Sequence, residues 1–269
     1  MFNNLLLEVS NKSHCLFEEW KYLLLQEKCS LCTRLIHPLI NKMDFETYSP
    51  PANYLVNNRR IVSDVLCQFC LPVLADCQAV LNSHQYFYQA DSNPVICDLK
   101  VASGAFFIEP IDSLIYRLKY SEDVLLGKDL ACLMYRAWQL LKAEIAKGGR
   151  CEEVCLVPVP LHKKRLNERG FNQAEVLAQQ LSSILSIKVE SKLLCRIRNT
   201  ASQQKLSKVE RARNVVAAFK VVNDEAFVGK KVILVDDVCT SAATLTECAK
   251  AMKAGGAEAI HALTVAFVP

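Results

Sequence analysis

The sequence lacks any uninterrupted apolar run of the roughly eighteen residues that a membrane-spanning helix needs. Its first residues, MFNNLLLEVSNK, contain neither the basic start nor the long apolar stretch of a secretory leader. It has no low-complexity tract, and its contents of 51% apolar and 22% charged residues are those of a globular protein. Thirteen cysteines in such a chain predict thiols that are free or metal-bound. We therefore expect a cytoplasmic protein with no membrane insertion.

The 269 residues are enough for one sizeable domain and an accessory unit. We predict a helical extension over residues 1–28, a four-cysteine unit with its connector over residues 29–100, and an α/β domain over residues 101–269. In the last segment, apolar runs typical of strands cover residues 105–108, 154–160, 232–235 and 259–267. Helical spacing of apolar residues covers 111–118, 126–141, 174–185 and 245–252. This alternation predicts a parallel sheet flanked by helices.

The stretch VILVDDVCTSAAT, residues 232–244, carries the strongest functional signal. Its apolar start predicts a buried strand that stops before Asp236 and Asp237, at the sheet edge where α/β proteins bind ligands. Hydroxyl side chains then precede a helix whose N-terminus suits a phosphate; they belong to Thr240, Ser241 and Thr244. The two carboxylates suit sugar hydroxyls or a divalent cation, so the whole stretch predicts a sugar-phosphate site. Alternatively, the carboxylates are merely solvated and one hydroxyl caps the helix.

Two segments concentrate positive charge. The first follows the expected strand 154–160 and contains His162, Lys163, Lys164, Arg165 and Arg169. It predicts anion binding at the same sheet edge, with a solvated helix entry as the alternative and a structural role for His162. The second contains seven cations against Glu210 alone, namely Lys192, Arg196, Arg198, Lys205, Lys208, Arg211 and Arg213. It lacks aromatic residues, which favours contact with a phosphate backbone over base stacking.

Two CxxC pairs supply four thiolates with the local spacing of a tetrahedral zinc site; they are Cys29 with Cys32 and Cys67 with Cys70. The role of Zn²⁺ here would be structural, contributing folding free energy on the order of 10 kcal/mol. An iron-sulfur cluster would use the same ligands, although nothing else in the chain indicates electron transfer. Cys239, by contrast, has no histidine near it in sequence and is interpreted as a small side chain under the loop.

The residues quoted above also carry a family resemblance. VILVDDVCTSAAT resembles the phosphoribosyl pyrophosphate (PRPP) loop of type I phosphoribosyltransferases. The runs PVPLHKKRLNERGFNQAEVLAQQL and RIRNTASQQKLSKVERARNVVAAF resemble the competence protein F (ComF) family within that fold. The resemblance covers residues 100–269 closely and the cysteine-bearing front end more loosely. It implies a type I phosphoribosyltransferase fold preceded by a zinc-binding unit.

The resemblance also implies roles for individual residues. Asp236 and Asp237 would bind the ribose hydroxyls of PRPP with Mg²⁺, and the 5′-phosphate would lie against Thr240, Ser241, Ala242, Ala243 and Thr244. The pyrophosphate would face Lys163, Lys164, Arg165 and Arg169, and residues 196–213 would form a mobile loop over the site or an ordinary charged hairpin. The family usually has glycine at position 242. Alanine there predicts a strain of about 1–2 kcal/mol at positive φ and a weaker PRPP site.

The ComF resemblance implies a role in natural transformation, in the handling of incoming single-stranded DNA in the cytoplasm. One hypothesis is a phosphoribosyltransferase with an acceptor that the sequence does not identify. The other is a non-enzymatic module that binds single-stranded DNA or a competence helicase and keeps PRPP as an effector or relic; Ala242 favours it slightly.

Overall fold

The computed structural model describes residues 99–120, 124–147, 153–200 and 207–268, together with the backbone of three short strands. These strands are β1 (Leu55–Val56), β2 (Arg59–Arg60) and β3 (Phe87–Gln89). The chain divides into two units, Met1–Val73 and Leu74–Pro269. In the first unit β1 and β2 pair antiparallel. The expected helical extension and the proposed zinc ligands Cys29, Cys32, Cys67 and Cys70 lie outside the described residues.

A six-stranded sheet in the order β3-β4-β10-β9-β5-β6 forms the second unit. Its further strands are β4 (Lys100–Phe106), β5 (Glu153–Pro158), β6 (Lys188–Val189), β9 (Lys230–Cys239) and β10 (Ala259–Phe267). β3 runs antiparallel to β4, and the other neighbouring strands pair in parallel. The unit therefore starts upstream of the boundary expected at residue 101, because β3 belongs to the same sheet.

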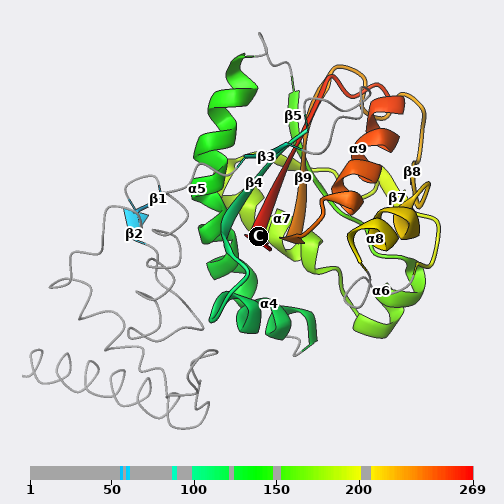
Figure 1. The fold of residues 1–269 in the computed structure, drawn as a ribbon. Coiled ribbons are helices and arrows are strands. Elements are labelled where there is room, and N and C mark those ends of the chain that lie inside the picture. The colour runs from blue at the N-terminus through cyan, green and yellow to red at the C-terminus, as the bar shows by residue number, and fades with distance from the viewer. Residues whose placement is uncertain are drawn as a thin grey trace, which may run out of the picture. The chain divides into compact units, whose positions relative to one another are not determined.

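Helices cover both faces of this sheet (Figure 1). On one face α5 (Leu126–Lys147) packs against β4 and β10, and α7 (Gln173–Leu185) packs against β5 and β9. On the other face α9 (Ala243–Ala254) packs against β10 and against β8 (Phe219–Val221), which pairs antiparallel with β7 (Leu194–Arg196). Three shorter helices also lie among the described residues of this unit: α4 (Ile111–Tyr120), α6 (Lys163–Arg169) and α8 (Lys208–Val215). In the part of the chain described here, no helix combines the length and apolarity needed to cross a bilayer.

The four helices predicted between residues 111 and 252 are confirmed, including the buried stripe of α9 formed by Leu245, Cys248, Ala249 and Met252. The last strand also has the predicted bounds. The strand predicted over residues 105–108 is present, but its bounds are wrong, since β4 covers residues 100–106. β4 is rich in small residues because α5 crosses close to it: a Cβ on Gly104 would lie 2.6 Å from the carbonyl oxygen of Leu133. The first part of the strand was missed because these small residues do not resemble an apolar run.

Candidate functional site

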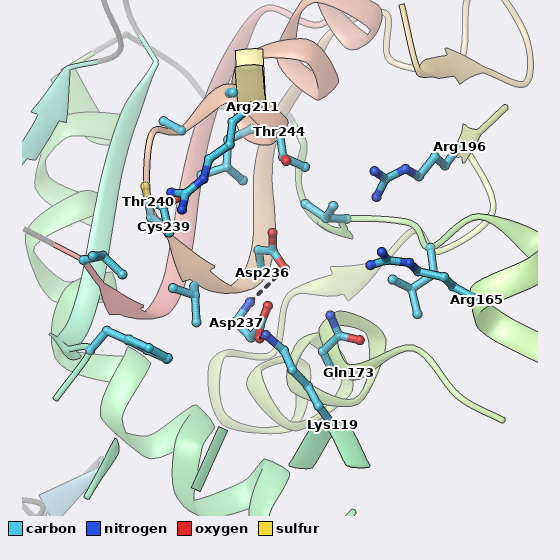
Figure 2. Close-up of a pocket in the computed structure, with 18 of the residues that line it drawn as sticks. Lys119, Arg165, Gln173, Arg196, Arg211, Asp236, Asp237, Cys239, Thr240 and Thr244 are labelled. Atoms are coloured by element: carbon cyan, nitrogen blue, oxygen red, sulfur yellow. Dashed lines mark hydrogen bonds and ion pairs between the residues drawn. The ribbon is translucent and has the colours of Figure 1, made fainter. Parts of the chain in front are cut away.

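β9 places two carboxylates in an open pocket because it extends further than β5. The pairing of β5 with β9 ends at Pro158 and Val235, whereas β10 accompanies β9 as far as Cys239. The prediction that the strand stops before Asp236 is therefore wrong, and both aspartates lie on the overhang. β5 and β9 are neighbours in the sheet, and the chain leaves them in opposite directions: β5 leads to β6 and β9 leads to β10. The carboxyl ends of β5 and β9 therefore form the switch point at which α/β sheets bind ligands. Asp236 and Asp237 line a pocket of about 440 Å³ there, called the main pocket (Figure 2).

The two carboxylates have different electrostatic environments. Asp237 forms an ion pair with Lys119 of α4, and its side chain is only 6% exposed. Burial acts to raise the pKa of Asp237, but the Lys119 ammonium and hydrogen bonds lower it below its ordinary value. Burial, followed by the charge of Asp237, raises the pKa of Asp236 well above its ordinary value. The main pocket therefore holds one carboxylate that favours its ionised form and one that favours its proton.

Residues 240–244, called the hydroxyl loop, lead from the end of β9 into the first turn of α9. Ala242 is the N-cap of α9 and has a φ of 53°, so the positive φ predicted at this position is confirmed. Its methyl group is 4% exposed and belongs to the apolar core beneath the loop. Thr240, Ala242, Ala243 and Thr244 line the main pocket. Ser241 does not line it, and its buried Oγ has no hydrogen-bond partner among the described residues.

The first basic segment divides between the main pocket and the surface. Arg165 and Arg169 lie one turn apart on α6 and both line the pocket, whereas Lys163 and Lys164 are exposed and do not line it. The Nδ1 atom of His162 accepts the backbone N–H of Lys164 at 3.2 Å and caps α6, which is the structural role expected for this histidine.

The second basic segment contributes Arg196 from β7 and Arg211 from α8 to the main pocket. In and after this segment the structure describes an antiparallel pair of β7 with β8 and, between these strands in sequence, α8; residues 201–206 lie outside the described part. Arg196 donates to Thr200 Oγ1 and stacks over the Phe219 ring at 5.3 Å. Burial lowers the pKa of Arg196, and no carboxylate within the described ranges forms an ion pair with it. A half-buried guanidinium held in this way is suited to receive an anion.

Sequence reasoning missed the contributions of α4 and of the start of α7. Lys119 and Tyr120 end α4, and Gln173 begins α7; all three line the main pocket. Arg169 links the two helices, because it donates to Gln173 Oε1 and lies 5.1 Å from the Tyr120 ring centroid. No motif marks these residues. The helix α8 was also missed, although Ser207 and Glu210 have the spacing of a capping box and form one in the structure.

Cys239 is buried, at 1% exposure, directly before the hydroxyl loop. Burial, assisted by the neighbouring charge of Asp236, raises the pKa of its thiol to about 12. A thiol that stays protonated is a poor nucleophile, which confirms the interpretation of Cys239 as a small side chain under the loop.

The main pocket fits Mg²⁺ only when a ligand shares its coordination. Across the described residues there is no cluster of three or more metal-ligating side chains, so no all-protein cage is present. Mg²⁺ usually binds through one or two carboxylates together with phosphate oxygens and water. Asp236 and Asp237 match that requirement, and a cation beside them would favour the ionised form of Asp236.

Comparisons with known proteins agree with this architecture. A family model described as a phosphoribosyl transferase domain matches residues 168–269. With the mostly parallel sheet and its flanking helices, this match defines an α/β domain that fits the type I phosphoribosyltransferase fold.

The relatives define the family more narrowly. The chain is 33% identical over 215 residues to Competence protein F of Haemophilus influenzae, an alignment covering 76% of this chain and 91% of the relative. It is 32% identical over 162 residues to the DNA utilization protein YhgH of Escherichia coli strain K12, covering 60% and 69% of the two chains. It is 37% identical over 111 residues to Competence protein ComFC of Bacillus subtilis, covering 41% and 43%. The chain therefore belongs to the competence protein F (ComF) family, and the resemblance noted in the sequence is confirmed.

Proposed function

We propose that the main pocket binds PRPP together with Mg²⁺. One observation carries this proposal: Asp236 and Asp237 at the end of β9, the hydroxyl loop at the N-terminus of α9 and several arginines all line one pocket. Arg165, Arg169 and Arg196 line the same pocket, and none of them is ion-paired with a carboxylate in the described part of the chain. The carboxylates can accept hydrogen bonds from sugar hydroxyls, the helix N-terminus can bind a phosphate, and the guanidinium groups can bind a pyrophosphate. Together they match one sugar phosphate.

Each part of PRPP is assigned to one part of the pocket. Asp236 and Asp237 accept hydrogen bonds from the ribose hydroxyls, and the backbone N–H groups of the hydroxyl loop bind the 5′-phosphate. The arginines of α6, β7 and α8 bind the pyrophosphate. Lys163 and Lys164 act by raising the positive potential at the entrance, since they lie exposed on the same short helix as Arg165.

Turnover is a separate step of the proposal. Transfer of the phosphoribosyl group would break the bond from the anomeric carbon to pyrophosphate and form a bond to an acceptor. The residues present contribute positioning and stabilisation of the leaving pyrophosphate, because the described pocket offers guanidinium donors but no nucleophilic thiolate. The acceptor is therefore the unknown to be found by experiment.

Isothermal titration calorimetry of PRPP with Mg²⁺ into the full-length protein tests the binding step. We expect binding by the wild-type chain and its loss in the double variant Asp236→Asn/Asp237→Asn. Asp224→Asn is the matched control, because Asp224 is exposed and does not line the main pocket. Wild-type protein that binds no PRPP, or a double variant that binds as well as wild type, would contradict the proposal. Binding would justify a screen of acceptors by pyrophosphate release.

A second candidate function is binding without turnover, and Ala242 is the observation that favours it. The hydroxyl loop holds Ala242 at a φ of 53°, which is strained for a residue with a Cβ, whereas a catalytic loop would have to keep its shape during reaction. The relatives named for competence and DNA utilization suggest single-stranded DNA, or a competence helicase, as the partner. A DNA affinity that falls with salt and survives Asp236→Asn/Asp237→Asn would support this candidate over an obligatory PRPP reaction.

We also propose that Cys29, Cys32, Cys67 and Cys70 bind one structural Zn²⁺. The support is their spacing in two CxxC pairs, since these residues lie outside the described part of the chain. Metal content of the purified full-length protein, measured by atomic emission, tests this assignment against an iron-sulfur cluster.

A further inference from the structure

A second pocket adjoins the main pocket along α4. It has a volume of about 300 Å³, which is at the lower end for small-molecule sites. Phe107, Tyr116 and Tyr120 supply aromatic rings to its lining. Phe107, Lys119 and Tyr120 line the main pocket as well, so the two pockets share a wall. We call this second hollow the α4 pocket.

The tyrosines of the α4 pocket are exposed rather than packed. Tyr116 and Tyr120 are 60% and 53% exposed, although large aromatic side chains gain most when buried. They lie four residues apart on one face of α4, and their ring centroids are 4.6 Å apart with planes tilted by 42°. The rings therefore present aromatic surface to a ligand instead of forming part of the core.

Cationic groups lie beside these rings. Lys119 lies between the two tyrosines in sequence and belongs to the lining of both pockets, where it is ion-paired with Asp237. The guanidinium group of Arg169 lies over the Tyr120 ring, 5.1 Å from its centroid. Aromatic faces next to cations are the combination that binds single-stranded nucleic acid, because bases stack while phosphates meet the positive charge. An apolar segment of a protein partner would gain nothing from these cations.

We propose that the α4 pocket binds an unpaired nucleobase, stacked on Tyr116 or Tyr120, while anionic groups attached or adjacent to it lie in the main pocket. The base could belong to a free acceptor or to a nucleotide of a single strand, and both sources share the same stacking chemistry. The position of the base next to a sugar phosphate rests on the proposed function, whereas the stacking contact does not. This pocket supplies the aromatic contact that the basic segment of residues 192–213 lacks.

Fluorescence anisotropy with the full-length protein tests the stacking contact. The probe is a labelled DNA oligonucleotide of about 12 nucleotides, compared with an abasic strand of the same length. We expect the abasic strand to bind more weakly, and Tyr116→Ala to weaken binding of the normal strand by about 5- to 30-fold. Tyr116→Phe keeps the ring and should bind as wild type does. Leu140→Ala is the control, because Leu140 is a 53% exposed apolar side chain on α5 and does not line either pocket.

A second arm distinguishes the two sources of the base. Free nucleobases are titrated into the protein with PRPP and Mg²⁺ present. A base that binds, and loses affinity in Tyr116→Ala, indicates an acceptor; a Tyr116 effect with the oligonucleotide alone indicates a strand. The proposal is overturned if normal and abasic strands bind equally, Tyr116→Ala changes nothing and no free base binds.

Failure of this proposal can be told apart from failure of the proposed function. Tyr116 does not line the main pocket, so Tyr116→Ala should retain PRPP binding by calorimetry. PRPP binding without a base effect would support the proposed function and contradict base binding in the α4 pocket. A base effect without PRPP binding would support base binding in the α4 pocket and contradict the proposed function.

Discussion

Replacing Ala242 with glycine separates the strain of the hydroxyl loop from its ability to bind a ligand. Ala242 has a φ of 53°, and a left-handed residue with a Cβ costs about 1–2 kcal/mol that glycine avoids. Two terms oppose this relief. Glycine makes the unfolded chain more flexible, which costs about 0.4–1 kcal/mol, and the variant loses a methyl group that is 4% exposed, worth about 0.8 kcal/mol. We therefore expect the free energy of unfolding to change by less than about 1 kcal/mol.

Ala217 provides a matched control for this calculation. It has a φ of 51° and is exposed, so Ala217→Gly relieves similar strain without losing a buried methyl group. We expect Ala217→Gly to raise the free energy of unfolding by about 0.5–1 kcal/mol, measured by urea denaturation. If Ala242→Gly stabilises the protein more than Ala217→Gly does, the contribution assigned to the buried methyl group is wrong.

The same variant measures whether alanine impairs the ligand site. The structure already has Ala242 in the left-handed region, and its methyl group lies in the core beneath the loop. We therefore expect Ala242→Gly to change the PRPP dissociation constant by less than about threefold, which is well under 1 kcal/mol. A gain in affinity of tenfold or more by calorimetry would refute this reasoning and would mean that the methyl group obstructs the phosphate.

Three further predictions concern the carboxylates and the cysteines. Burial raises the pKa of Asp236, so at pH values above the ordinary carboxyl pKa its ionisation opposes folding. Asp236→Asn should therefore raise the free energy of unfolding by about 0.5–2 kcal/mol near pH 7. That gain should vanish in acid, where Asp236 is protonated in both states, and a gain independent of pH in urea titrations would contradict it. Lys119→Met should lower the free energy of unfolding by about 1–3 kcal/mol, which is less than for a fully buried ion pair because the Lys119 side chain is 22% exposed. Adding Asp237→Asn should recover most of that loss, because no unpaired charge then remains buried. Replacing one CxxC pair by serine should remove about one zinc per chain by atomic emission, and an unchanged zinc content would exclude these ligands; the proposed ligands are Cys29, Cys32, Cys67 and Cys70.

The sequence was sufficient where local patterns carried the information. α9 and β10 could be predicted because their apolar spacing is strong and Gly255 follows the helix. The ends of β9 could not be predicted in this way. Its extension through Asp236 and Asp237 depends on pairing with β10, which no local pattern encodes. The positive φ at Ala242 could be predicted only through the family resemblance, which marks this position as one that normally holds glycine.

The residues that sequence reasoning missed share one physical origin. Lys119 and Tyr120 reach the main pocket because α4 packs with its apolar stripe inward and its last turn at the end of the sheet. Their positions on α4 are those of ordinary surface residues, so only the tertiary structure assigns them a role. Arg165 was predicted together with Lys163 and Lys164, but only the tertiary structure separates them: one face of α6 lines the pocket while Lys163 and Lys164 are exposed.

The charge balance of the main pocket connects these observations to the nature of its ligand. Among the described residues, five cationic side chains line it against two carboxylates: Lys119, Arg165, Arg169, Arg196 and Arg211. Lys119 is committed to Asp237 and Asp236 favours its proton, and Arg165, Arg169 and Arg196 form no ion pair with a carboxylate among the described residues. A ligand with a single phosphate would leave much of this positive charge unmatched in a partly buried site, where charge is costly. A ligand that brings several phosphate groups and a divalent cation satisfies both sets of residues, because the phosphates match the arginines and the cation favours ionised Asp236. This requirement favours PRPP over a simple sugar monophosphate.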